Sequence, residues 1–253
     1  PDGQVFGGPL KVQVRSVDGQ VVVQAGGRAN VGEVASHFAL PAKERLDGTA
    51  AWKSDISIRR RNADFVVESD LVGVSSRFPE PLAKNAAEPL ALRVERTALD
   101  AEREQYRVAL GGAANGTLVN GPKGIERAVV ALGEGDARLP EKGIAVRIAL
   151  PRQDADAWKG VLPAGDAGGG APSAAALDLV SIKTPLLRLF DRDFTQVDTV
   201  LRPRQGGWQI SVNMHEAAGD VFWHSAGDGS LDGRLQRLVV LPAITTVKRD
   251  IDL

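Results

Sequence analysis

The chain of 253 residues contains no cysteine, which excludes disulfides, thiol catalysis and zinc–thiolate sites. Aromatic residues make up only 5% of the sequence, so a core or binding surface must be built mainly from aliphatic side chains. Lysine and arginine total 31 against 32 acidic residues, and this net charge of −1 disfavours general nucleic-acid binding. No apolar run approaches the ~20 residues of a membrane-spanning helix. The chain begins at Pro1 and its single methionine is Met214, which indicates an excised or processed segment of a longer protein.

Motifs that carry chemistry are also missing. No pair among His37, His215 and His224 has the i, i+4 spacing of a helical metal site, so these histidines are expected on the surface or in the core. The run 191–193 has two aspartates but lacks the ladder of a calcium loop, and a solvated turn is the better interpretation. Glycine-rich stretches do not end in Lys-Ser/Thr, and no G-x-S-x-G elbow occurs. We therefore expect no enzyme activity, no metal and no cofactor.

What the sequence does contain is alternation of apolar and polar residues, which is typical of strands with one wet face. Leu10, Val12 and Val14 show it first, and similar runs recur every 8–12 residues between glycine and proline turns, which predicts a mainly β fold. Two short helices are expected, at 31–38 after the capping residue Asn30, and at 153–161. A linker rich in glycine, alanine and proline at 164–175 divides the chain into segments 1–163 and 176–253.

The clearest strand pair covers 49–59 and 64–74, joined by the polar turn 60–63. Residues two apart on a strand share a face, so one face of this pair collects apolar side chains. These are the candidate ligand-contacting residues: Trp52, Ile56, Ile58, Phe65, Val67 and Leu71. A long sheet with one apolar face must fold onto a second sheet, close into a barrel, or curl around an apolar ligand.

Two further groups of residues have a functional and a structural interpretation. The basic run Arg59–Arg61 can contact anionic lipid headgroups or form a solvated hairpin tip, and the hairpin tip is favoured. The four tryptophans can line a ligand groove or anchor a core, and the core is favoured.

Several motifs resemble one family, and their number and order carry the resemblance. A Gly-x-x-x-W step at Gly48 and Trp52 leads to the sequence ESDL with a following glycine at 68–73, and a Pro-Pro-Leu-Lys break follows at 79–84. Another Gly-x-x-x-W step ends the series at Gly219 and Trp223. From about residue 7 to residue 242 the chain resembles the YhdP family of AsmA-like envelope proteins of Gram-negative bacteria. One departure is Asp191, since family members more often have glycine after the phenylalanine.

The resemblance implies a periplasmic segment of a protein anchored in the inner membrane. It implies a long, curled, antiparallel-rich β-sheet that forms a taco-like groove, with two short helices. Such bridge-like proteins are implicated in moving phospholipids between the inner and outer membranes without catalysis. The implied partners are phospholipids, neighbouring segments of the same parent chain and other envelope proteins.

Two other functions remain open at this point. A closed β-sandwich that serves as a scaffold or interaction module would pack its apolar faces internally and recruit partners through strand edges. A hydrolase of envelope polymers would need carboxylates that converge in a cleft, and the sequence selects none.

Overall fold

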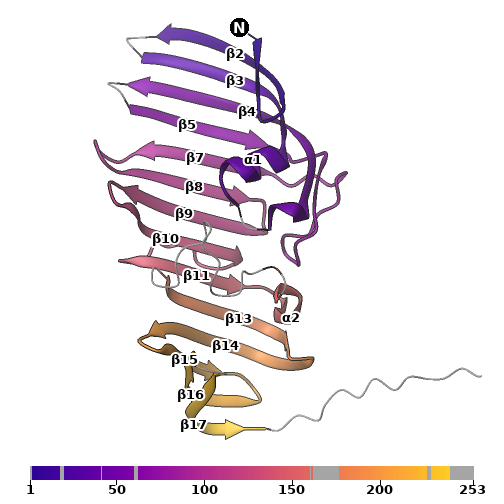
Figure 1. The fold of residues 1–253 in the computed structure, drawn as a ribbon, viewed down its shortest axis with the longest axis vertical. Coiled ribbons are helices and arrows are strands. Elements are labelled where there is room, and N and C mark those ends of the chain that lie inside the picture. Colours follow the sequence, from indigo (N-terminus) through magenta and orange to yellow (C-terminus); the bar gives the residue numbers. More distant parts are fainter. Residues whose placement is uncertain are drawn as a thin grey trace, which may run out of the picture.

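The computed structural model describes residues 2–17, 20–40, 42–59, 62–159, 161, 177–226 and 229–239. Figure 1 shows one long sheet whose strands follow one another along the longest axis of the molecule. The strands are β1 (Asp2–Val5), β2 (Gly8–Val17), β3 (Gln20–Asn30), β4 (Leu46–Arg59), β5 (Asn62–Ser69), β6 (Val74–Ser76), β7 (Leu92–Ala98), β8 (Glu104–Leu110), β9 (Ala114–Gly121), β10 (Gly124–Gly133), β11 (Gly143–Ala149), β12 (Arg152–Asp154), β13 (Leu177–Leu189), β14 (Arg192–Arg204), β15 (Gly207–Asn213), β16 (Ala217–His224) and β17 (Ser230–Leu238).

Pairing follows chain order almost throughout, and most neighbours are antiparallel because short turns join them. β5 pairs with β7, while β6 pairs with β4 beside the sheet. The pairs β10–β11, β11–β13 and β12–β13 are parallel. The sheet does not close, since β1 and β17 lie at opposite ends. The predicted mainly β, antiparallel-rich fold is confirmed, and the described strands form one open sheet rather than a closed sandwich.

The first predicted helix is confirmed as α1 (Val31–His37). The side chain of Asn30 caps it by accepting hydrogen bonds from the backbone N–H groups of Gly32 and Glu33. The second helix is shorter than expected: α2 covers only Ala155–Trp158. Asp154 caps α2, and Gln153 instead pairs with Leu187 in the sheet. A 3₁₀ turn, η1 (Lys43–Arg45), precedes β4.

The expected linker at 164–175 lies outside the described residues. On its two sides, β11 and β13 are parallel neighbours, so the strands before and after it belong to the same sheet.

The two long edges formed by the strand ends differ in what covers them. On one, here called the helical rim, lie α1, η1, the segment 70–91 and α2 (Figure 1). Ring centroids of Phe78 and Trp158 are 6.4 Å apart, so the segment after β5 reaches α2. The opposite edge, the hairpin rim, carries the tight connections 99–103 and 121–124.

Backbone crowding explains the glycines at the helical rim. Gly48 has φ +108°, and a Cβ there would lie 2.1 Å from the carbonyl oxygen of Gly73. Gly73 has φ +98°, and its Cβ would lie 2.4 Å from the carbonyl oxygen of Thr49. Only glycine fits both the left-handed backbone and the close approach of β4 to β6.

We expect Gly48→Ala to lower the free energy of unfolding by about 2 kcal/mol or more, because strain and a backbone clash add. Urea denaturation of the 253-residue chain measures this. Gly112→Ala is the matched control, since nothing lies within 4 Å of its added Cβ and its φ is not left-handed. Its stability should change by no more than about 0.5 kcal/mol. Equal losses in the two variants would contradict the crowding argument.

Candidate functional site

The side chains of two paired residues project from the same face of a β-sheet. The pairing registers therefore assign every strand position to one of two faces. One register row runs through the sheet from β2 to β17 without a charged residue. Its members are Val12, Ala25, Ser54, Val67, Val94, Val108, Gly116, Val130, Val146, Val180, Leu201, Ile210, Val221 and Gly233. We call the side that carries this row the apolar face and the opposite side the polar face. At the ~4.8 Å spacing of strands, the row extends roughly 60 Å.

Large side chains on the apolar face are unusually open to solvent. The exposed large apolar residues that lie within strands are all on this face: Val14, Val21, Ile58, Val108, Ile125, Val130, Trp223, Leu231, Leu235 and Leu238. Exposed apolar side chains that gather on one face are typical of surfaces that bind a partner or a ligand.

The polar face carries a ladder of alternating charges over β4, β5, β7 and β8. Lys53 Nζ lies 2.9 Å from a carboxylate oxygen of Glu68, which also pairs with Arg93. Hydrogen bonds from Lys53 and Arg93 lower the pKa of Glu68. Arg93 continues the ladder to Glu95 at 2.6 Å. Each exposed pair adds little stability, but the ladder keeps this side of the sheet wet.

The connection between β10 and β11, residues 134–142, crosses the polar face because these strands are parallel. Arg147 holds it there, since Nη1 donates to the carbonyl oxygens of Asp136 and Arg138 at 2.7 and 2.6 Å. The polar-face residues in this region are buried: Val119, Val129, Ala131 and Ala145. The crossover therefore covers the polar face, while on the apolar face Val130 stays exposed and its neighbours Ala128 and Ile144 are buried.

The structure brings five of the six predicted ligand-contacting residues together on the apolar face. Ile56 pairs directly with Phe65, and Val67 lies opposite Ser54. Trp52 and Ile58 lie on the same face of β4.

Leu71 does not join this row, because β5 ends at Ser69. The Ser69 hydroxyl accepts a hydrogen bond from the backbone N–H of Leu71, and the Asp70 carboxylate accepts one from the backbone N–H of Val72; these bonds turn the chain. Leu71 consequently has φ +51°, beyond the strand whose alternation placed it among the candidates.

The other tryptophans divide between two places. Trp208 and Trp223 are register partners on the apolar face, whereas Trp158 lies in α2 against Phe78. Of the basic run, Arg59 donates to Gln20 at 2.6 Å, while Arg60 and Arg61 lie outside the described residues. The histidines are likewise scattered: the ring of His37 contacts Phe38, and His224 Nε2 lies 2.9 Å from Asp232.

A polar cluster interrupts the apolar face at the hairpin rim. Arg96 Nε and Nη2 each lie 2.6 Å from the same carboxylate oxygen of Glu104, and Arg96 Nη1 donates to the carbonyl of Ala63. Tyr106 and Asn120 donate to the other carboxylate oxygen of Glu104, at 3.1 and 3.3 Å. Burial raises the pKa of Glu104, but these hydrogen bonds outweigh it, so that the net pKa is lowered. We call these four residues, Arg96, Glu104, Tyr106 and Asn120, the rim cluster.

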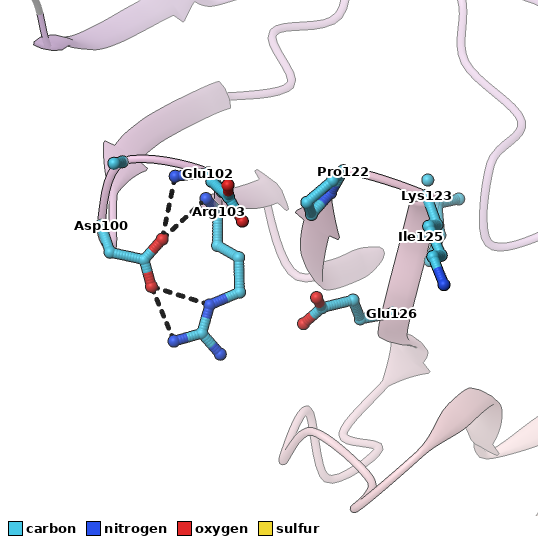
Figure 2. A pocket seen from close by; sticks show the side chains of 9 residues that line it. Asp100, Glu102, Arg103, Pro122, Lys123, Ile125 and Glu126 are labelled. Carbon is cyan, nitrogen blue, oxygen red and sulfur yellow. Dashed lines mark hydrogen bonds and ion pairs between the residues drawn. The ribbon is translucent and has the colours of Figure 1, made fainter.

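Next to the rim cluster, the two hairpin tips enclose an open hollow of about 850 Å³ (Figure 2). Asp100 accepts hydrogen bonds from Arg103 and from backbone N–H groups of its own turn. Glu126 and Lys123 come from the facing tip (Figure 2). The lining carries both signs of charge.

At the helical rim, Asp156 in α2 holds the tip of the β13–β14 hairpin. Its carboxylate accepts from the backbone N–H groups of Phe190 and Asp191, both at 2.9 Å, and lies 2.5 Å from Lys159 Nζ. The hydrogen bond from Lys159 and the two backbone donors lower the pKa of Asp156 to about 2. Phe190 and Asp191 form the turn with φ +53° and +55°, so only Asp191 of the expected turn at 191–193 lies in it, while Arg192 and Asp193 begin β14.

No group of three or more His, Asp or Glu side chains that could hold a metal occurs within the residues that the structure describes. Among the described helices, none has the length and apolarity needed to cross a membrane.

Sequence reasoning missed the rim cluster and the role of Lys84. The Lys84 ammonium is buried and donates to the carbonyl oxygens of Val74 and Asn85 at 2.8 and 3.0 Å, which holds the segment after β5 in place. The signal for the rim cluster was present: Arg96 and Glu104 stand at apolar positions of otherwise alternating strands.

Comparison with known proteins identifies the family of this sheet. The family model described as "YhdP protein" matches residues 2–250. The chain belongs to the YhdP family. It is 26% identical over 228 residues to the intermembrane phospholipid transporter YhdP of Escherichia coli (strain K12). The alignment covers 83% of this chain but 18% of that protein, so the chain spans under a fifth of its relative's length. No solved structure matches the chain.

Membership of the YhdP family gives the motifs a structural interpretation. Gly48 and the glycine after ESDL, Gly73, are the two residues that meet where β4 approaches β6. Asp191 has φ +55°, a left-handed backbone conformation that glycine adopts without strain. Gly219 has φ +146°, and a Cβ there would lie 2.2 Å from the Arg234 carbonyl oxygen in β17. These motif residues build the sheet and its rim; they do not form a reaction centre.

We expect Asp156→Asn to destabilise the chain at neutral pH, because the folded carboxylate has a lowered pKa. The stabilisation is fully present above the unfolded pKa of 3.8 and is lost as the pH falls through the folded value of about 2. Urea denaturation of the wild type and the variant at several pH values should show a stability difference at pH 7 that shrinks below about pH 4. Asp136→Asn is the control, since Asp136 lies at the surface of the crossover. A difference that grows on acidification would contradict this assignment.

Proposed function

We propose that the chain is a non-enzymatic lipid-carrying segment, and that phospholipid acyl chains lie along the apolar face during transfer between membranes. The single observation that carries this proposal is the register row from Val12 to Gly233, which crosses the sheet without a charge. Burying a methylene on such a surface is worth about 0.8 kcal/mol, so many weak contacts suffice to hold a lipid without a specific binding residue.

Three features favour lipid over a packed protein core. The exposed large apolar residues of the strands lie on this face, the crossover occupies the opposite face, and the named relative is a phospholipid transporter. In this proposal the sheet curls into a groove, with segments 1–163 and 176–253 as successive parts of its wall. The five residues that include Ile56 and Phe65 line its N-terminal half.

The relative's name also supports a location in the cell envelope. We infer that the chain works in the periplasm as part of a protein anchored in the inner membrane, and that neighbouring segments of that protein and other envelope proteins extend the conduit. A pure scaffold would not need an exposed apolar face of this length.

Photo-crosslinking tests the position of the acyl chains. Val108 and Arg107 are neighbours on β8 and point to opposite faces. With benzoylphenylalanine at position 108, the 253-residue chain incubated with phosphatidylethanolamine and phosphatidylglycerol vesicles should form lipid adducts detectable by mass spectrometry. At position 107, adducts should be at least about fivefold fewer, because that side chain faces water. Equal labelling at the two positions, or none at either, would reject the proposal.

Charge substitutions separate an open face from a packed one. Val130 is 43% exposed on the apolar face, whereas its neighbour Val129 is 1% exposed beneath the crossover. We expect Val130→Asp to change the free energy of unfolding by less than about 1 kcal/mol while reducing lipid capture. Val129→Asp should cost several kcal/mol, about 3 or more, because it buries an unpaired charge. Thermal melting and a lipid-capture assay measure both; a collapse of Val130→Asp would favour a packed core instead.

A further inference from the structure

Two residues of the rim cluster, Arg96 and Glu104, occupy strand positions where the alternation predicts apolar residues. In strands β2 to β5 and β7 to β9, Arg96 and Glu104 are the charged residues that the registers place on the apolar face. Burial of a charge against apolar neighbours is costly unless the charge is paired and hydrogen-bonded, so an apolar residue would be the simpler choice at each position. Their side chains are 22% and 24% exposed, so the pair is neither hidden in a core nor fully solvated.

The position of the rim cluster fits one end of an amphipathic ligand. Val94 and Val108 continue the apolar row on the same two strands, while the hollow between the hairpin tips begins at Arg103, next to Glu104. A ligand with acyl chains on that row would therefore bring its polar end to the rim cluster.

We propose that the rim cluster is a headgroup site for zwitterionic phospholipids with a primary ammonium, in which Arg96 binds the phosphate and Glu104 binds the ammonium. This inference rests on the proposed function, since acyl chains on the apolar face bring the headgroup to the rim.

The chemistry of the pair matches that class of headgroup. A guanidinium carries five N–H donors, more than the three bonds described above use, and it suits phosphate oxygens. A carboxylate accepts hydrogen bonds from a primary ammonium, and Tyr106 and Asn120 hold Glu104 by one oxygen from the side. Arg96 and Glu104 together have no net charge, and the zwitterionic headgroup has none either. An anionic glycerol headgroup offers no cation to Glu104, so it would form only the interaction between its phosphate and Arg96.

Tyr106 is the single tyrosine of the chain, which makes it a built-in reporter of this site. With ring-¹³C-labelled tyrosine in the 253-residue chain, the Tyr106 resonances can be followed by NMR during titration with dihexanoyl phosphatidylethanolamine or dihexanoyl phosphatidylglycerol below their micellar concentrations. We expect saturable shifts with phosphatidylethanolamine and an apparent affinity about fivefold or more above that for phosphatidylglycerol. Glycerophosphoethanolamine, which has the same polar group and no acyl chains, should bind far more weakly.

The double variant Arg96→Gln/Glu104→Gln should bring the affinity ratio of the two lipids close to one while keeping acyl-dependent binding. The matched control, Arg93→Gln/Glu95→Gln, removes an ion pair of the same strand on the polar face and should leave the ratio unchanged.

The outcomes separate the two proposals. Equal wild-type affinity for the two lipids overturns the headgroup site and leaves the proposed function standing. An unchanged ratio in the Arg96/Glu104 variant also overturns it. Tight binding of glycerophosphoethanolamine alone would identify a soluble phosphate–amine compound as the ligand, and this too rejects the headgroup site. Failure of both lipids to bind rejects the proposed function together with this inference.

Discussion

Side chains of paired residues must leave a β-sheet on the same side, and this constraint governs the whole molecule. It carries one apolar row from β2 to β17 across antiparallel and parallel pairs alike. A one-residue slip at any pair would reverse the faces of all following strands. The crossover held by Arg147 returns the chain over the polar face, so the apolar row continues from β10 to β11 without interruption.

Local patterns in the sequence were sufficient to predict most elements. The alternation of valines with polar residues located the strands and assigned Ile56 and Phe65 to one face, and Asn30 marked the start of α1. These signals depend on residues close in sequence, so they can be recognised before the fold is known. The resemblance to the family rested on short motifs that include Gly48 and Gly73, whose backbones approach each other closely.

Other features were not predictable, because a competing local hydrogen bond or a partner distant in sequence decides them. The end of β5 is set by side-chain hydrogen bonds at Ser69 and Asp70, which compete with the strand alternation that continues to Leu71. Gln153 joins β12 rather than α2 because Leu187, far along the chain, offers it a strand partner. The rim cluster likewise forms only when β7, β8 and β9 lie side by side, and no single strand shows that Arg96 and Asn120 converge on Glu104.

Because the helical rim and the hairpin rim differ, the two ends of an elongated ligand on the sheet would have different surroundings. One long edge is belted by α1, the segment 70–91 and α2, with Phe78 against Trp158, while the other ends in bare hairpin tips (Figure 1). A two-ended molecule on the apolar face therefore meets different neighbours at its two ends and has one preferred way round. Several such molecules bound side by side along the sheet would share one orientation, as lipids do within one leaflet of a bilayer.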